Sequence, residues 1–442
     1  MIDYAKADFY TDASLCDDPH AYFKYLREQG PVTRLPYRNV VAVTGYDEVM
    51  QVMLDSEHFS TVNAVTGPIP DLPFVPEGDD ITAQVIAARS KIAFSDQVVT
   101  ADGERHANLR SLLSCLFTPS RLKALQPGLV ITADALIDEF VADGKVDLVR
   151  QYGGPYATLI IADLLGLPAK DRQLFRTYLE KPSGLDIGAT QEEMMNNPLV
   201  SVGKHIFGHL ARRRLWNSPL GKVGKKIAAI FTGGDAGKED ILTELALAKF
   251  RDGSTPSQVD VTGLGAFLFG AGQDTTNRLL ANAFRVIATR PDIQADLRAN
   301  PDRIAPFLEE VLRYDGSVKS GGRLCVRTTT IGGVEIKAGT TILLTHMGAN
   351  RDPRRFDNPD EFIMDRPKIQ EHLAFGRGAH TCIGAPLARA EVKASITRLL
   401  SRMGNIRLSE AHHGPEGERH FDYEPTYVLR ALRSLHLEFD PI

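Results

Sequence analysis

The chain has 442 residues, of which 43% are hydrophobic, and a formal net charge of -5. A chain of this length can bury a large core with a deep pocket, and its slightly acidic balance argues against nucleic acid or an anionic membrane as a partner. Because the N-terminal segment lacks a cationic stretch followed by an apolar run, and no segment approaches the ~20 apolar residues that span a bilayer, we expect a cytoplasmic protein.

From the N-terminus to the middle of the chain, hydrophobic periodicity predicts mostly helices. Residues 19–29 are predicted to form a helix, and short strands over 32–34 and 40–43 are expected to begin a small sheet. Residues 66–103 lack sustained periodicity, so we expect a long loop that covers or binds a ligand. The remaining predicted helices of this part cover residues 106–116, 125–142, 155–165, 169–180, 202–215, 240–250 and 262–290.

The last third of the chain has a different pattern, because β-branched residues become frequent after Arg313. Segments 323–330, 333–336 and 341–345, separated by glycine turns, predict a second small sheet. A final helix is expected over 385–402 and a closing hairpin over 427–439. No linker or change in composition divides the chain, so we expect residues 1–442 to form one domain, mainly α with two small β-sheets.

The chain contains four cysteines, whose scattered positions fit neither a zinc site nor a disulfide framework. Cys382 has informative surroundings, the glycine-rich run Phe375-Gly376-Arg377-Gly378-Ala379-His380-Thr381-Cys382-Ile383-Gly384 just before the final helix. Glycine allows positive φ and the close approach of a flat ligand, and the N–H groups and dipole of a helix N-terminus favour an anionic sulfur. We expect a thiolate of low pKa that can bind haem iron; a buried free cysteine in a glycine-rich turn is the alternative.

The long predicted helix over 262–290 has an unusual polar centre, Ala271-Gly272-Gln273-Asp274-Thr275-Thr276. Gly272 lowers helix stability by roughly 1 kcal/mol relative to alanine, and threonine hydroxyls can bond back to the i−4 carbonyl and open the helical ladder. Such a break would leave a groove for oxygen and water. There Thr275 could hydrogen-bond oxygen while Asp274 relays protons from solvent, which is general acid catalysis; an exposed Asp-Thr cap is the alternative.

Residues 375–384 match the haem-binding signature of the cytochrome P-450 family, which reads Phe, Gly, any, Gly, any, His or Arg, any, Cys, any, Gly. The chain resembles this family from about Asp18 to Phe439. The resemblance implies the cytochrome P-450 fold, with haem b (iron protoporphyrin IX) between the helix of Asp274 and the loop of Cys382, its axial iron ligand. It also implies that Thr275 is the catalytic alcohol and Asp274 the catalytic acid.

Other positions match structural and haem-binding residues of the family. Glu310 and Arg313 lie at i,i+3 on one helix face, and the resemblance implies that they stabilise the core beside the thiolate loop together with an arginine from the following loop. Two haem propionates need cationic partners, because a buried unpaired carboxylate is costly. The resemblance assigns propionate contacts to His106, Arg110, Arg323 and His380, and further haem contacts to Ala271, Phe375 and Gly384. A solvated position is the alternative for His106, Arg110 and His380.

Substrate-facing positions are inferred from the same resemblance. They are mostly apolar, which favours a hydrophobic substrate of terpenoid, aromatic or steroid type. The residues are Phe267, Gly270, Ala271, Val318, Lys319, Val428 and Leu429, with the loop over 66–100 nearby. Lys319 could meet a substrate carboxylate, or point to solvent or a propionate. Gly321 stands where some relatives carry an acid, which leaves the shielding of the propionates open.

The resemblance implies a haem-thiolate monooxygenase that inserts one oxygen atom of O2 into its substrate, most simply by hydroxylation. The chain has neither a dinucleotide-binding glycine motif after a strand nor an iron–sulfur cysteine cluster. Electrons are therefore expected from a separate ferredoxin or flavodoxin fed by a reductase, docking near Arg110 and Arg377, and the protein is expected to be a monomer. A peroxide-driven peroxygenase and a haem-based gas sensor are the alternatives.

Overall fold

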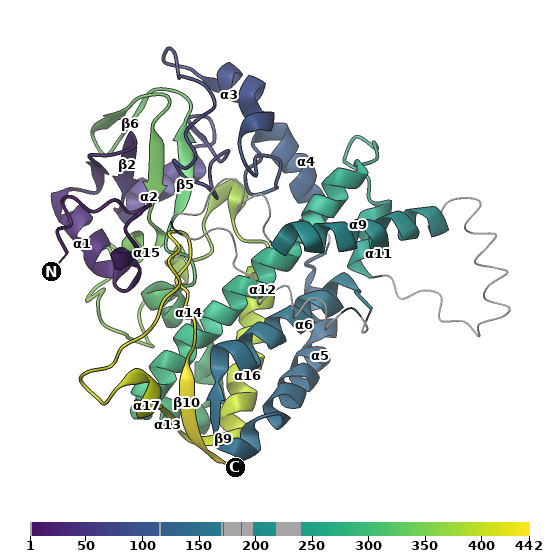
Figure 1. Ribbon diagram of the computed structural model, residues 1–442, viewed down its shortest axis with the longest axis vertical. Coiled ribbons are helices and arrows are strands. Elements are labelled where there is room, and N and C mark those ends of the chain that lie inside the picture. Colours follow the sequence, from purple (N-terminus) through teal and green to yellow (C-terminus); the bar gives the residue numbers. More distant parts are fainter. Residues whose placement is uncertain (1, 115, 169–170, 172–186, 188–197, 218–239) are drawn as a thin grey trace.

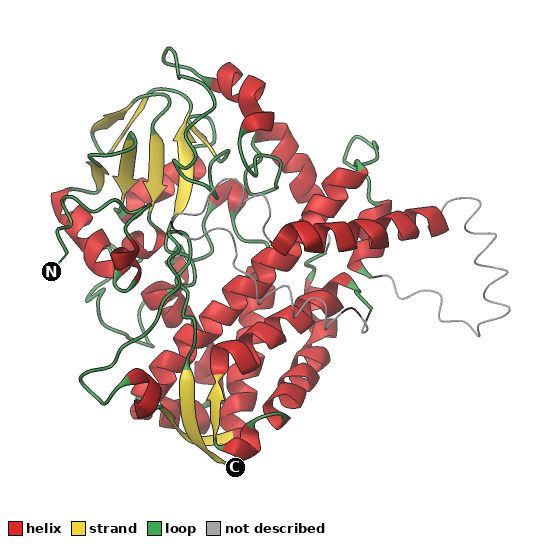
Figure 2. Ribbon diagram, viewed as in Figure 1, coloured by secondary structure: helices red, strands yellow, loops and turns green. Residues whose placement is uncertain are grey.

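The computed structural model describes residues 2–114, 116–168, 171, 187, 198–217 and 240–442. Helices fill most of the body, and the strands gather in two places (Figure 2). The helix expected over 169–180 lies outside the described residues except for position 171. The helices are α1 Pro19–Gln29, α2 Tyr46–Leu54, α3 Thr82–Ala88, α4 Gly103–Ser114, α5 Pro119–Asp138, α6 Gly154–Leu165, α9 Pro198–Asn217, α11 Ile241–Leu247, α12 Gln258–Thr289, α13 Pro291–Ala299, α14 Ile304–Asp315, α15 His346–Ala349, α16 Ala385–Arg402 and α17 Glu410–His413.

Helix ends follow local capping chemistry. The α1 bounds are as predicted, because the Asp18 side chain accepts from the N–H of Ala21 at one end and Gly30 follows the other. Helix α12 begins four residues earlier than predicted. The cause is a capping box in which Ser257 Oγ accepts from the N–H of Asp260 and the Asp260 carboxylate accepts from the N–H of Ser257.

The strands predicted to form an N-terminal and a C-terminal sheet lie side by side in one five-stranded sheet, ordered β1-β2-β8-β5-β3. The two groups join where β2 pairs in parallel with β8, with Val41 opposite Ile342. Glycine turns at 332–333 make a separate two-stranded ladder, β6-β7. The strands are β1 Val32–Arg34, β2 Val40–Val43, β3 Phe59–Ser60, β4 Lys145–Asp147, β5 Gly321–Cys325, β6 Thr329–Ile331, β7 Val334–Ile336, β8 Thr341–Leu344, β9 Met403–Leu408 and β10 His436–Pro441.

A three-stranded sheet of order β4-β10-β9 closes the other end of the molecule. The hairpin predicted over 427–439 is wrong, because β10 starts at His436 and pairs with strands from elsewhere in the chain. Leu429 instead makes an isolated bridge to Val318. The expectation of an irregular segment over 66–103 is also wrong in part, since helix α3 and the turn Arg89–Lys91 lie within it.

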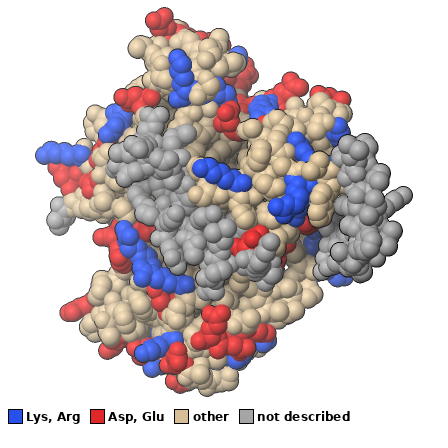
Figure 3. Space-filling model, turned by 45° about the vertical axis from the view of Figure 1, so that its right-hand side comes forward, with Lys and Arg blue, Asp and Glu red and all other residues tan. Residues whose placement is uncertain are grey.

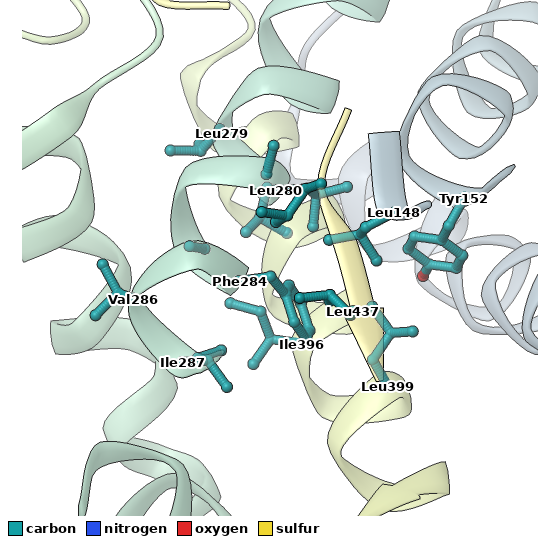
Figure 4. Close-up of a cluster of buried hydrophobic side chains, with 14 of the residues drawn as sticks. Leu148, Tyr152, Leu279, Leu280, Phe284, Val286, Ile287, Ile396, Leu399 and Leu437 are labelled. Atoms are coloured by element: carbon teal, nitrogen blue, oxygen red, sulfur yellow. The ribbon is translucent and has the colours of Figure 1, made fainter. Parts of the chain in front are cut away.

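Helix α12 runs through the body and contacts α6, α9 and α16 (Figure 1). Figure 4 shows the buried cluster around its C-terminal half, where side chains of α12 meet α16 and β10. The labelled members include Leu280, Phe284, Ile287, Ile396, Leu399 and Leu437. Burial of each such side chain contributes about 1.5–3 kcal/mol. This packing fixes α12 against α16, which directly follows the thiolate loop.

The outer surface carries both signs of charge. Lys and Arg are interspersed with Asp and Glu on the face drawn in Figure 3. Among the helices of the described residues, none is long and apolar enough to cross a bilayer.

Candidate active site

The thiolate loop, residues 375–384, is closed by its own backbone. The N–H of Cys382 donates to the carbonyl oxygen of Phe375 at 2.8 Å. Gly376 and Gly378 have φ of 64° and 74°, in the left-handed region that favours glycine. A Cβ on Gly378 would lie 2.8 Å from the carbonyl oxygen of Met53, so the loop packs tightly against the end of α2.

Solvent reaches the Cys382 residue, but the many protein atoms around its sulfur make desolvation the main influence on the pKa of the thiol. Burial raises the pKa of the thiol above its ordinary value, and the N–H groups of Gly384 and Ala385 and the guanidinium of Arg110 offset only part of that shift. The prediction of a low pKa is therefore wrong for the metal-free thiol. The helix-end donors stabilise an anionic sulfur, but a bound cation is needed to deprotonate it fully.

The centre of α12 has an open face. Ala271 is exposed although it lies in the middle of the helix. One turn later, Thr275 Oγ1 donates to the carbonyl oxygen of Ala271 at 2.7 Å, which is the i−4 bond expected from the sequence. Ser317 Oγ, from the segment after α14, donates to the carbonyl oxygen of Thr275 at 2.8 Å. The hydroxyl of Thr275 and the segment around Ser317 therefore lie at the same place.

Asp274 is held by a charged chain on the side of α12. Its carboxylate lies 2.7 Å from the guanidinium of Arg278, which also lies 2.9 Å from the carboxylate of Glu424. The Arg278 side chain is 6% exposed, whereas those of Asp274 and Glu424 are 29% and 31% exposed. Arg278 thus bridges two partly solvated acids, a partner for Asp274 that the sequence analysis missed.

Thr276 links α12 to α16. Its hydroxyl donates to Oε2 of Glu391 at 2.9 Å. Burial raises the pKa of Glu391 to about 8, and the hydrogen bond from Thr276 offsets part of this rise. Glu391 has no distinguishing pattern in the sequence, because an acid within a helix ordinarily lies on the solvated face.

Four basic residues, His106, Arg110, Arg323 and His380, converge near the thiolate loop; we name them the cation cluster. The rings of His106 and His380 lie 3.9 Å apart, and Arg110 donates to the carbonyl oxygen of Thr381. Burial lowers the pKa of Arg323 to about 10. Burial, reinforced by the neighbouring cations His106 and Arg323, lowers the pKa of His380 to about 3.

Among the described residues, the cation cluster has no directly paired anion, although Asp102 acts on Arg323, His106 and His380 from a longer distance. Within the described part of the chain, no carboxylate lies at ion-pair distance from Arg110 or Arg323. Nε2 of His106 is buried without a hydrogen-bond partner. So is Nδ1 of His346, a residue that the sequence analysis missed, whose pKa is lowered to about 4 by burial and then by Arg323. Buried cations and unpaired ring nitrogens gathered at one place fit an anionic ligand.

A second group of buried charges differs from the cation cluster, because its members are paired with one another. Glu310 and Arg313 are 0% exposed and lie 2.7 Å apart, and Arg366 lies 3.2 Å from Glu310. We name these three residues the ion-pair core. Arg313 also donates to the carbonyl oxygens of Asn350, Pro359 and Glu361.

A further acid, missed by the sequence analysis, ties α14 to α16. Glu309 lies 2.6 Å from Arg389 and 3.0 Å from His372. Burial opposes its ionisation, but these two hydrogen-bonded partners bring the pKa of Glu309 down to about 2. The Arg389 guanidinium also lies 4.6 Å from the ring centre of Phe375, so this pair braces the first residue of the thiolate loop.

A model of the family described as Cytochrome P450 matches residues 14–404. The chain belongs to the cytochrome P450 family. Mycobacterium marinum cytochrome P450 CYP150A6, solved in its substrate-free form, is 45% identical, with a TM-score of 0.88 over 99% of both chains. Cytochrome P450 109 of Bacillus spizizenii is 30% identical over 87% of this chain and 84% of its own length. The cytochrome P450 monooxygenase PikC of Streptomyces venezuelae is 30% identical over 96% and 91%.

This P450 is a haem-thiolate monooxygenase that uses O2, a small-molecule substrate and a redox partner, and its cofactor is haem b held by a cysteine thiolate. Its residues fit that cofactor. Cys382 offers a reachable sulfur, Gly384 leaves free space next to it, and the cation cluster supplies donors for two carboxylates. The predicted fold and enzyme class are therefore confirmed.

The expected substrate-facing positions come from three segments that meet near Thr275. Val318 bridges to Leu429, and Val428 accepts a backbone hydrogen bond from residue 319 at 2.8 Å. The hydrogen bond from Ser317 brings this pair of segments against α12. The half-buried side chains of this P450 at these positions are Phe267, Val318, Val428 and Leu429, with Gly270 beside them on α12.

Lys319 is placed differently from every alternative considered in the sequence. It is 1% exposed, its ammonium donates to the carbonyl oxygen of Thr426, and it lies 3.8 Å from Sγ of Cys16. Burial lowers its pKa to about 8. The extended backbone that bridges to Val428 and Leu429 explains this, since alternation along it turns Val318 and Lys319 to opposite sides. Gly321 faces His346, whose Cε1 would lie 3.4 Å from an added Cβ.

Proposed function

We propose that this P450 hydroxylates a hydrophobic small molecule, with Cys382 as the haem ligand, Thr275 and Asp274 as proton donors, and a ferredoxin or flavodoxin as the source of electrons. Haem b, when bound, activates O2 and transfers one oxygen atom to the substrate. One feature supports this proposal above the others: Ala271 and Thr275 form an open face at the centre of a helix whose C-terminal half is packed in the core.

Thr275 and Asp274 have distinct tasks. The hydroxyl of Thr275 donates a hydrogen bond to the Ala271 carbonyl oxygen, and rotation about χ1 turns the hydroxyl towards the open face. Asp274 receives protons from solvent through its partly exposed carboxylate, while Arg278 holds the carboxylate in place. The proton then passes from the Asp274 carboxylate to the hydroxyl of Thr275, the next residue on α12.

The substrate site is apolar on each segment that contributes to it. Phe267 and Ala271 contribute to the site from α12, and Val318, Val428 and Leu429 contribute from the segments across from Thr275. Each buried CH2 of a ligand would contribute about 0.8 kcal/mol there, so affinity grows with hydrocarbon size. A relative 28% identical to this chain is the cyclomarin C epoxidase CymV of Salinispora arenicola, which makes epoxidation the second reaction to examine.

The redox partner is proposed to dock beside the thiolate loop. Gly378 and Ala379 are exposed there, and Arg377 donates to the carbonyl oxygen of Gln370 rather than to a carboxylate. An acidic ferredoxin would be attracted to this arginine. Reversal of its charge in Arg377→Glu should slow reduction and weaken its salt dependence, whereas Arg407→Glu on the distant β9 serves as the control. Equal reduction rates in both variants would exclude this surface.

Cytoplasmic location, a monomeric state and a single domain over residues 1–442 stay predictions. The function itself is tested by screening hydrophobic compounds for the spin-state change that follows displacement of water from the haem, then measuring product with a surrogate ferredoxin and reductase. Oxygenated product that requires both electrons and O2 is expected. A spin-state change without product would indicate a sensor, and product formed only with added peroxide would indicate a peroxygenase.

The ligand assignment has its own test. Cys382→Ser should abolish turnover and the thiolate-type spectrum of the reduced carbon-monoxide complex. Cys325→Ser is the matched control, because Cys325 is buried in the five-stranded sheet. Retention of the parent spectrum by Cys382→Ser would contradict the assignment.

Thr275→Ala tests the proton route. It should keep haem content and substrate-induced spectra but lower product per electron, with peroxide released instead, because the positioned hydroxyl is lost. Loss of such a donor costs on the order of 10²-fold or more in the step it serves. Thr275→Ser, which keeps the hydroxyl, should restore coupling, and unchanged coupling in Thr275→Ala would remove Thr275 from the mechanism.

A further inference from the structure

Three ligand-type side chains meet at a place that the proposed function does not use. His205 and His209 lie one turn apart on the same face of α9. Asp171 belongs to the chain just after α6, where its N–H donates to the carbonyl oxygen of Pro168 at 2.9 Å. The three side chains are 25%, 9% and 13% exposed, so they form a recessed group that solvent can still reach.

The distances within this group form a nearly regular triangle. Oδ2 of Asp171 lies 3.1 Å from Nε2 of His205 and 3.1 Å from Nε2 of His209. The two Nε2 atoms lie 3.1 Å from each other. Ligands around tetrahedral zinc, with bonds of about 2.05 Å, stand roughly 3.3 Å apart. One ion could therefore contact all three atoms after shifts of only a few tenths of an ångström.

We propose that Asp171, His205 and His209 bind one divalent transition-metal ion of the zinc type, with water completing a four-coordinate shell. Two imidazoles and one carboxylate are ligands that zinc accepts readily, whereas magnesium and calcium prefer all-oxygen sites. Both rings bind as Nδ1–H tautomers, so each Nε2 lone pair and one carboxylate oxygen face the ion.

Hydrogen bonding alone satisfies the triangle poorly. If both Nε2 atoms carry hydrogens, two N–H donors converge on one carboxylate oxygen while their nitrogens lie only 3.1 Å apart. If one Nε2 is bare, its lone pair faces the carboxylate. A cation at the centre removes both conflicts, because all three atoms then act as donors of electron pairs to it.

The charges around the group permit a cation. Arg213 lies one turn beyond His209, but its guanidinium is neutralised by Asp240 at 2.6 Å. Arg213 also donates to the carbonyl oxygen of Gly166 at the end of α6. The ion would thus add a second tie at a place where α9 already meets the end of α6.

The proposed metal site lies beside a close contact between α9 and α12. Ile206 and Leu210, next to the two histidines, are fully buried in the cluster that contains Leu264 and Leu268 of α12. A Cβ on Gly265 would lie 2.9 Å from Ile206, which shows how closely the two helices approach. The proposed ion therefore stabilises the packing of α9 and α6 around α12, and takes no part in the chemistry at Cys382.

The test uses the full-length, haem-loaded chain without an affinity tag. After chelator treatment and dialysis, Zn²⁺ is titrated by calorimetry, bound zinc is counted by elemental analysis, and the zinc X-ray absorption edge gives its ligands. One zinc per chain, two nitrogen ligands and a zinc-dependent rise in thermal midpoint are expected. Mg²⁺ at the same concentration should neither bind nor stabilise.

Substitutions assign the site. His205→Ala, His209→Ala and Asp171→Asn should each weaken zinc binding by roughly 100-fold or more and abolish the stabilisation, with haem content and spectrum unchanged. His412→Ala is the matched control, because His412 stacks on His436 at 3.8 Å in a separate histidine group. His205 is the more exposed ligand, so its variant keeps the test valid if His209→Ala does not fold. No bound zinc, or equal weakening by His412→Ala, would overturn the proposal.

Discussion

The ion-pair core and the cation cluster both contain buried arginines near the thiolate loop, but only one of them is complete. In the core, Glu310 faces Arg313 and Arg366, and the remaining guanidinium N–H groups donate to backbone carbonyls. In the cluster, Arg323 donates to the carbonyl of its own neighbour Gly322, and among the described residues no carboxylate lies at ion-pair distance from it. A buried charge whose partners are all present is structural, whereas one whose partners are missing marks a ligand.

The titration behaviour of the cluster follows from this difference. Burial lowers the pKa of Arg323 to about 10 and that of His380 to about 3, and the more distant Asp102 offsets only part of each shift. A bound dianion would supply the missing charge and raise both values. The cofactor would therefore give the cation cluster the negative charge that Glu310 gives the ion-pair core.

The largest expected effect is on the core. Glu310→Gln removes the carboxylate that faces two arginines of 0% and 3% exposure, so it should lower the free energy of unfolding by about 3–5 kcal/mol. Denaturant unfolding of the haem-loaded chain measures this loss. Glu335→Gln, in an exposed pair with Lys337, is the control and should leave the midpoint unchanged. If Glu310→Gln were equally harmless, the core would not be structural.

The next largest effect concerns Glu391, a buried acid that accepts a hydrogen bond from Thr276. Glu391 has a folded pKa of about 8, above its ordinary value of 4.5, so protonation favours the folded state. Its contribution is complete below about pH 4.5 and is lost as pH rises through 8. Glu391→Gln should remove this loss, which is on the order of a few kcal/mol at high pH.

Unfolding of parent and Glu391→Gln at about pH 6 and about pH 9 measures that difference. The variant should be the more stable protein at the alkaline end, because its amide cannot ionise. Glu416→Gln, an exposed substitution, should follow the parent at both values. If the free energy of unfolding changed equally in parent and Glu391→Gln between the two pH values, Glu391 would ionise without a loss of stability.

The smallest expected effect belongs to the cluster. Arg323→Gln should not destabilise the haem-free chain, since it removes an unpaired buried charge, but it should weaken haem retention by roughly 10- to 100-fold. Transfer of haem to an acceptor protein measures this. Arg327→Gln, which breaks surface pairs with Glu57 and Asp80, is the control. Retention equal to the parent would exclude Arg323 as a propionate partner.

The sequence predicted the bounds of α1 and α16 correctly, because Asp18 caps the first helix and a proline occupies the first turn of the second. It also predicted the back-bonded Thr275 and the Glu310–Arg313 pair, because both depend on spacing along one helix. It failed for the joined sheet, the terminal strand and Lys319. These depend on pairing between residues that are distant in the chain, such as Val41 with Ile342 and Lys319 with the carbonyl of Thr426.

The family, the thiolate loop and the polar centre of α12 can be recognised from the sequence, since these are local patterns whose chemistry resides in adjacent residues. Tertiary packing sets which charges are paired and what burial does to the pKa of Cys382, Glu391 and Lys319. It alone brought Asp171 to the two histidines of α9. The reason is that desolvation and ion pairing depend on the atoms around a group, which packing brings from remote parts of the chain.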